Sequence, residues 1–192
     1  MSPAGHLALA QEIDALRRQF EQISAAGEAL VAPLTDEDFS WRREPGSWSI
    51  GQCLDHLNVV ARLYLPVLDE GIADGIRRGY YGGGPYRYWW TGRVLAWIVE
   101  PPPRVRAKTV REWEPPVRRP RQEVLAAFRA YQVQFIDRLR QANGLDLARA
   151  RVRSPVSRWL RMSLGSGFAV MAAHERRHLW QARAIARQLE RL

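Results

Sequence analysis

The sequence predicts an all-α protein, a four-helix bundle built as one domain over residues 1–192. Four long segments repeat apolar residues at steps of three and four, which places those residues on one face of a helix. Clusters of proline and glycine fall between these segments, where a chain turns. The chain has 192 residues, of which 46% are hydrophobic and 26% charged, and this suits one globular domain with a buried core.

The first helix is expected over about residues 4–32, where the apolar positions recur at helical spacing. Pro33 and the turn-like residues 35–38 end it. The second helix is expected to begin at Ser49. Ser49 and Gln52 have the spacing of a capping box, in which each side chain accepts a hydrogen bond from the backbone N–H of the other residue.

Residues 79–120 form a different kind of segment, a long connection or insertion rich in aromatic residues and proline. A glycine-hinged aromatic cluster occupies residues 80–90, and a short helix is expected over 91–100, before three consecutive prolines. The segment is too aromatic for a flexible linker. We therefore expect it to pack across one end of the bundle as a long crossover between the second and third long helices.

The third long helix is expected over about residues 121–143 and the fourth over about 166–191. A basic loop that contains Arg151, Arg153 and Arg158 connects them. These arginines suit recognition of an anionic substrate or cofactor, and they equally suit a solvated loop. The bundle is expected to be either up-down-up-down or a variant created by the long crossover.

Charge and cysteine content limit the classes of function. The formal net charge is +9, but scattered arginines supply nearly all of the positive charge, which makes nucleic-acid binding the weaker interpretation. No apolar run reaches the roughly 20 residues of a membrane-spanning helix. The N-terminus turns charged too early for a signal peptide. With one cysteine, Cys53, and hence no disulfide framework, we expect a cytoplasmic protein without a membrane partner.

Three histidines are the candidates for chemistry. His174 and His178 stand four residues apart on the last helix, so both imidazoles lie on one face, one turn apart, as two metal ligands on a helix do. His56 lies at the margin of the apolar face of the second helix. Three imidazoles facing one bundle core can bind a divalent ion and leave positions open for water or substrate. Core histidines with a structural role are the alternative.

Two further residues are candidates for supporting roles. Gln181 lies one turn after His178 and is placed to donate to a ligand or a substrate. Glu175 completes an H-E-x-x-H sequence, the signature of zinc proteases. Such proteases take a third ligand from downstream, but Glu190 lies about 18 Å further along the same helix. We therefore interpret Glu175 as exposed or as a support for a ligand, and not as an established general base.

The two histidine segments resemble the DinB-like (YfiT-related) superfamily. Residues 48–57, WSIGQCLDHL, are similar to its helix-two signature, and residues 174–181, HERRHLWQ, are similar to its helix-four signature. The resemblance implies a homodimer and a divalent metal ion (zinc, nickel, iron or manganese) held by His56, His174 and His178. The family has members similar to metal-dependent hydrolases and to S-transferases that use low-molecular-weight thiols.

The sequence thus predicts a metal-dependent enzyme, a hydrolase or a thiol S-transferase that acts on a small molecule. Residues 79–120 depart from the family pattern, so the resemblance assigns no specific substrate. Two alternatives stay open. One is a non-catalytic module that binds a metal or a small ligand. The other, which the scattered charge favours less, is a basic nucleic-acid-associated protein.

Overall fold

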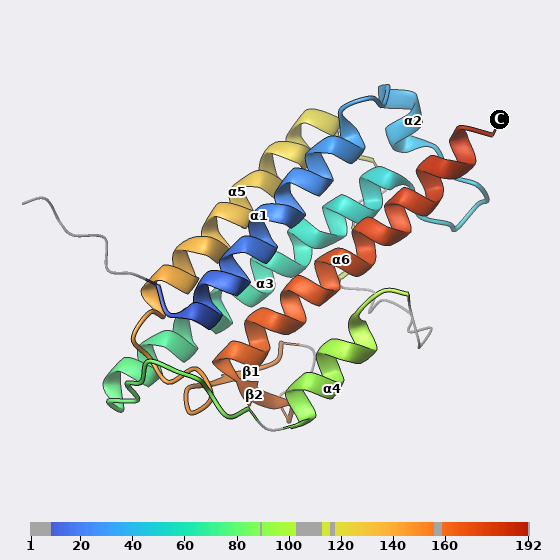
Figure 1. Cartoon of the computed structure of the whole chain (residues 1–192). Coiled ribbons are helices and arrows are strands. Elements are labelled where there is room, and N and C mark those ends of the chain that lie inside the picture. The colour runs from blue at the N-terminus through green and yellow to red at the C-terminus, as the bar shows by residue number, and fades with distance from the viewer. Residues whose placement is uncertain (1–8, 89, 103–112, 116–117, 156–158, 192) are drawn as a thin grey trace, which may run out of the picture.

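Four long helices form the centre of the structure, a computed structural model that describes residues 9–88, 90–102, 113–115, 118–155 and 159–191. They are α1 (Gln11–Val31), α3 (Ile50–Arg77), α5 (Arg121–Gln141) and α6 (Leu164–Leu189). Figure 1 shows them side by side as one bundle. The prediction of an all-α four-helix bundle is confirmed.

The helices follow an up-down-down-up order. Helices α1 and α3 each pack against both α5 and α6, so α1 and α3 lie diagonally opposite each other. The side chain of Asn58, near the start of α3, donates to the carbonyl of Val124, near the start of α5, at 3.0 Å, so these two helices run parallel. Because a short loop cannot join parallel neighbours, the long crossover between them creates this order (Figure 1).

The capping box expected at the start of α3 is present. The Ser49 hydroxyl accepts from the Gln52 N–H at 3.1 Å, and the Gln52 side chain accepts from the Ser49 N–H at 3.2 Å. Both residues are buried. The first turn of α3 is therefore fixed in the bundle, and so is Trp48, which directly precedes it.

Two expectations for the N-terminal part were wrong. Helix α1 begins at Gln11, after non-helical residues 9–10; the rest of the start expected near residue 4 lies outside the described residues. Residues 35–38 are more than a turn, because they cap and open a short helix, α2 (Asp36–Ser40). Thr35 and Asp38 form its capping box, and acidic residues suit both a turn and the first turn of a helix, so composition alone did not separate the two.

The described part of the crossover packs against the bundle, as expected. The Tyr86 N–H and the Tyr88 hydroxyl donate to the Glu12 carboxylate of α1 at 3.1 and 3.0 Å. Helix α4 (Trp90–Val99) then lies along the outside of α6 (Figure 1). Arg176 of α6 binds both carboxylate oxygens of Glu100, at 2.6 and 2.7 Å, which fastens the end of α4.

A small hairpin replaces part of the loop expected before the last helix. Strands β1 (Arg151–Arg153) and β2 (Arg161–Ser163) pair antiparallel, with Val152 opposite Met162. Both of these apolar side chains are buried. Strands of three residues are too short to show an alternating pattern in the sequence. Arg158, the third arginine expected in this loop, lies outside the described residues.

Among the described residues, no helix combines the length and the apolar character needed to cross a membrane.

The hairpin lies close to α3 because Gly71 has no side chain. A Cβ atom at this position would lie 2.5 Å from a methyl carbon of Val152 and 3.2 Å from the carbonyl oxygen of Arg151. Gly71→Ala is therefore expected to lower the free energy of unfolding by about 1 kcal/mol. Overpacking lowers the free energy of unfolding by ~1–3 kcal/mol, and the better helix propensity of alanine raises it by up to ~1 kcal/mol. Urea unfolding measures the difference.

Gly83→Ala is the matched control, because a Cβ there meets no atom within 4 Å and the backbone is not left-handed. It should change the free energy of unfolding by less than about 0.5 kcal/mol. A Gly71→Ala protein as stable as the wild type would contradict the close packing of the hairpin on α3.

Candidate metal centre

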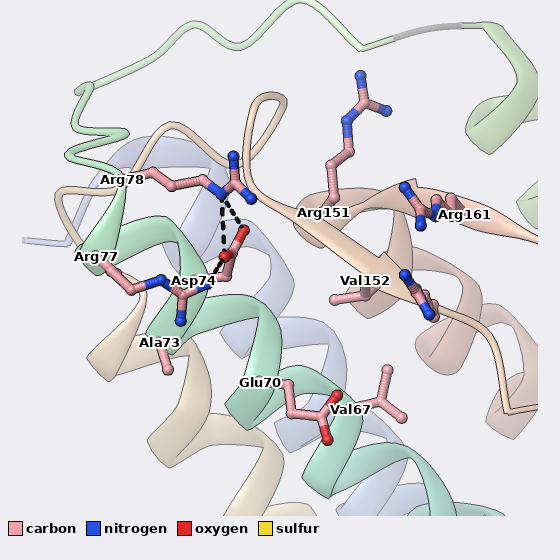
Figure 2. A pocket seen from close by; sticks show the side chains of 10 residues that line it. Val67, Glu70, Ala73, Asp74, Arg77, Arg78, Arg151, Val152 and Arg161 are labelled. Atoms are coloured by element: carbon pink, nitrogen blue, oxygen red, sulfur yellow. Dashed lines mark hydrogen bonds and ion pairs between the residues drawn. The ribbon is translucent and has the colours of Figure 1, made fainter.

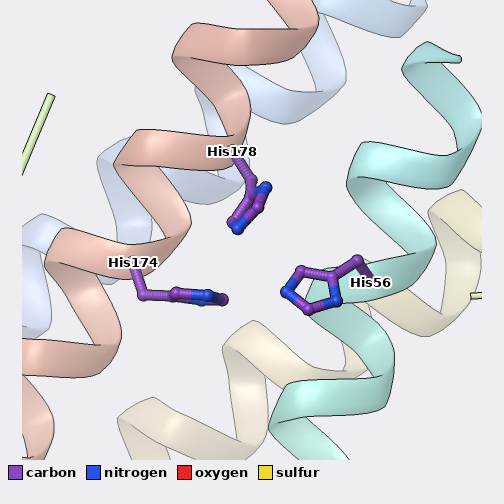
Figure 3. A group of neighbouring side chains, drawn as sticks. All are labelled: His56, His174 and His178. Atoms are coloured by element: carbon purple, nitrogen blue, oxygen red, sulfur yellow. The ribbon is translucent and has the colours of Figure 1, made fainter. Parts of the chain in front are cut away.

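The three histidines selected from the sequence come together between α3 and α6. His56 projects from α3, and His174 and His178 project from successive turns of α6 (Figure 3). The ring centroids lie 4.5 Å (His56–His178), 4.6 Å (His174–His178) and 5.3 Å (His56–His174) apart. One ring nitrogen from each can be chosen so that all three lie within 4.8 Å of one another.

Burial keeps the three imidazoles neutral near pH 7. His56 and His178 are buried, and His174 is half-buried. Loss of hydration lowers the pKa of each ring, to about 3 for His174 and well below the ordinary value for His178. The neighbouring histidines lower the pKa of His174 and His178 further. Neutral rings carry a free lone pair, which a metal ion requires.

One backbone carbonyl fixes the tautomer of His56. Its Nδ1 lies 2.8 Å from the carbonyl oxygen of Trp113, which can only accept, so Nδ1–H donates. The lone pair is then on Nε2. Metal-binding histidines are commonly held in this way, by a hydrogen bond from the second ring nitrogen.

The other two histidines retain unused ring nitrogens. Nδ1 of His174 and Nδ1 of His178 are buried and have no hydrogen-bond partner among the described residues. A hydrogen bond to the side chain of Gln181 raises the pKa of His178, against the larger effect of burial. An unpartnered buried polar atom costs ~1–3 kcal/mol, so the site is incomplete without a ligand or water.

Trp48 covers one side of the cluster. Its ring lies 5.0 Å from that of His56 and stacks 5.7 Å from that of His178. Trp48 was not predicted to belong to the site, although this residue directly precedes the capping box of α3. Its apolar ring restricts water and limits the rotation of both imidazoles.

The residues present fit a divalent ion. Two nitrogens bound to one zinc ion lie at most ~4.2 Å apart, since each bond is ~2.1 Å, so a small side-chain rotation brings the cluster to that spacing. The donors are all imidazoles, a ligand type that suits zinc, nickel and iron. Cys53 does not join them, because it is buried in the core and burial raises the pKa of its thiol.

Glu175 is buried and not exposed. Its Oε1 accepts from the side chain of Gln132 of α5 at 3.1 Å, and its Oε2 has no partner among the described residues. Burial raises the pKa of this carboxyl group to about 8, although Gln132 and Arg176 act in the opposite direction. Glu175 therefore links α6 to α5 across the core of the bundle through Gln132.

Two polar residues beside His56 hold the end of the crossover. Asp55, buried on α3, accepts from Arg119 at 3.1 Å and from Asn58 at 3.4 Å, and Asn58 also binds the backbone at the start of α5. They tie the chain that follows Trp113 to α3. Trp113 and Arg119 could not be found from the sequence, because a backbone carbonyl has no residue signature and the pairing of Arg119 with Asp55 spans 64 positions.

The fold and the cluster define a helical bundle protein with a three-histidine site. The sequence matches the DinB superfamily over residues 19–182, and the chain belongs to this superfamily.

One solved structure with the same fold is that of YfiT from Bacillus subtilis, which is described as a probable metal-dependent hydrolase with an unusual four-helix bundle topology. The two proteins share 14% sequence identity at a TM-score of 0.63, over 99% of this chain and 94% of YfiT. The search of curated proteins finds no match.

Metal-free protein is expected to lose stability as the pH falls below about 6.5, the pKa of an unfolded histidine. The three depressed pKa values mean that unfolding takes up as many as three protons, each contributing up to ~1.4 kcal/mol per pH unit. Glu175 has the opposite effect. Its raised pKa keeps the carboxyl group protonated in the folded protein at a pH where it is ionised in the unfolded chain, so unfolding releases one proton. On unfolding, the three protons taken up by the histidines outweigh the one released by Glu175, so a fall in pH lowers the free energy of unfolding.

Urea unfolding at pH 7.5, 6.5 and 5.5 in a chelator measures this dependence. His174→Gln/His178→Gln removes two of the titrating rings and should flatten it. An equally steep loss of stability in that variant would show that other groups cause the effect.

Proposed function

We propose that the protein is a metal-dependent hydrolase of a small molecule, with one divalent ion held by His56, His174 and His178. The observation that carries the proposal is the cluster itself, three buried or half-buried neutral imidazoles from two helices with nitrogens within 4.8 Å. The description of YfiT as a probable metal-dependent hydrolase supports it. The identity of the ion is left to experiment, because zinc, nickel, iron and manganese are all candidates.

A divalent ion at this position would supply Lewis acidity, which activates water for attack and polarises a carbonyl group. Side chains and backbone groups of the protein would orient the ligands and exclude bulk water. Trp113 holds His56 in one tautomer, and Trp48 shields one side of the cluster from bulk water. His174 is the most exposed of the three histidines, which supports an approach of the substrate from its side. Gln181, one turn after His178, raises the pKa of that ring and is placed to orient it.

The finer alternatives stay predictions. Thiol S-transfer uses the same cluster with a thiol in place of water, and a binding module uses it without turnover. The homodimer, the cytoplasmic location and the nucleic-acid-associated role also stay predictions. An activity panel distinguishes the first two from hydrolysis.

The metal content of protein purified without a histidine tag tests the ligand set. About one divalent ion per chain is expected in the wild type and almost none in His56→Ala/His178→Ala, since one imidazole cannot hold the ion. His6→Ala is the control, because it removes the fourth histidine, which is distant in sequence from the other three. Inductively coupled plasma mass spectrometry gives the stoichiometry. A wild type that stays metal-free after reconstitution with zinc, nickel, iron and manganese would overturn the proposal.

Hydrolysis is tested with the loaded protein on a panel of small esters, amides and lactones. At least one substrate should be turned over, with a loss of at least 100-fold in His56→Ala/His178→Ala. Loaded protein that conjugates thiols to electrophiles but hydrolyses nothing would favour the S-transferase. Loaded protein without either activity would favour the binding module.

A further inference from the structure

A second concave site lies at the opposite end of α3 from the histidines. The last turns of α3 and the β1–β2 hairpin enclose a hollow of about 450 Å³, here called the arginine pocket (Figure 2). Five arginines line it: Arg77, Arg78, Arg151, Arg153 and Arg161. Its volume is within the ~300–1,000 Å³ of small-molecule sites.

The positive charge in the arginine pocket is only partly neutralised. Its lining carries two carboxylates, Glu70 and Asp74, against five guanidinium groups, a formal excess of three positive charges. Asp74 is already occupied, because Arg77 and Arg78 both bind it (Figure 2), with Arg78 Nε at 3.0 and 2.8 Å from the two oxygens.

Within the described part of the chain, the three hairpin arginines have no acidic partner. No carboxylate among the described residues forms an ion pair with Arg151, Arg153 or Arg161. Their guanidinium groups are therefore available to an anion from solution.

Two of these arginines face each other across the two strands, at the kind of position where opposing side chains of an antiparallel pair lie closest together. Arg153 pairs with Arg161. The Ser154 N–H donates to the Leu160 carbonyl at 2.8 Å, which makes the adjacent Arg153–Arg161 pair a non-hydrogen-bonded one. The Cβ atoms of such pairs lie ~4.5–5.5 Å apart, and like charges there destabilise a hairpin. An anion bound between them removes the repulsion.

The hairpin backbone holds these charges in place. Val152 and Met162 are buried, so the alternation of a strand directs Arg151, Arg153 and Arg161 to the opposite, exposed face. Arg151 and Arg153 are two residues apart, about 6.6 Å along β1. Cationic groups spread over this span match a ligand with several anionic groups better than a single ion, and each arginine fork can bind a phosphate bidentately.

We propose that the arginine pocket binds a small molecule that carries two or more phosphate groups. Asp74 follows His56 by 18 residues on one helix, about 27 Å at 1.5 Å per residue, so a small ligand cannot span both sites. The arginine pocket is thus separate from the histidine cluster and takes a second ligand. Its concave shape favours a small molecule over a nucleic-acid duplex.

Isothermal titration of the full chain with inorganic tripolyphosphate, at 50 mM salt, tests the proposal. Divalent metal ions are first removed with a chelator that is then dialysed away, because tripolyphosphate itself binds such ions. Saturable binding of one tripolyphosphate per chain is expected, with at least ten-fold weaker affinity in Arg153→Gln/Arg161→Gln. Arg18→Gln/Arg129→Gln is the matched control, because it removes the same charge from exposed sites on α1 and α5. The control should bind tripolyphosphate within two-fold of the wild type.

Thermal unfolding without ligand provides a readout that does not depend on the titration. Relief of the cross-strand repulsion should leave Arg153→Gln/Arg161→Gln at least as stable as the wild type. Tripolyphosphate should raise the unfolding temperature of the wild type and of Arg18→Gln/Arg129→Gln more than that of Arg153→Gln/Arg161→Gln. Arg151→Gln is a second variant that leaves the facing pair intact, and it should also weaken binding.

Three results would overturn the proposal. Equal weakening in the pocket and control variants would indicate general attraction to a basic protein. Binding of citrate without binding of tripolyphosphate would indicate a carboxylate ligand. Binding of a 20-base-pair DNA duplex through Arg153 and Arg161, without binding of tripolyphosphate, would make this face a nucleic-acid surface.

Discussion

Burial of three neutral imidazoles between α3 and α6 is the constraint on which the candidate site depends. Polar rings in a core cost free energy unless their nitrogens find partners, so the two helices must meet in one register. Serine caps define where each helix starts: Ser49 begins α3, and Ser163 begins α6 by accepting from the Ser166 N–H at 3.2 Å. His56 then follows the start of α3 by two turns, and the pair on α6 lies opposite it.

The long crossover has a direct part in this arrangement. Four antiparallel helices joined by short loops would leave no backbone passing beside His56. Because α3 and α5 run parallel here, the chain must return along the bundle, and it passes the histidines on the way. The Trp113 carbonyl then accepts a hydrogen bond from His56. The Asp55–Arg119 ion pair fastens the segment that follows Trp113 to α3. The long crossover thus sets the tautomer of a candidate ligand.

Features encoded by local spacing could be predicted from the sequence, and features made by distant contacts could not. The capping box at Ser49 and Gln52 and the single face of His174 and His178 each follow from a spacing of three or four residues. Trp113 contributes a carbonyl oxygen that every residue type has, so nothing in the sequence marks it. The hairpin depends on Val152 and Met162 packing on α3, where Gly71 makes room, and three-residue strands carry no readable pattern.

The two ends of α3 differ in whether their ionisable side chains are neutral, paired or left charged without a partner. At the histidine end, burial removes charge, because the imidazoles stay neutral and Asp55 is neutralised by Arg119. At the hairpin end, positive charge is retained, because Arg151, Arg153 and Arg161 have no ion-pair partner among the described residues and Arg153 faces Arg161 across the two strands. A carboxylate opposite an arginine would be more stable there than the like-charge pair, and the ligand proposed above would supply the missing negative charge. The proposed ligand would thus bind next to the start of α6, because β2 leads without a gap into the helix that carries His174 and His178.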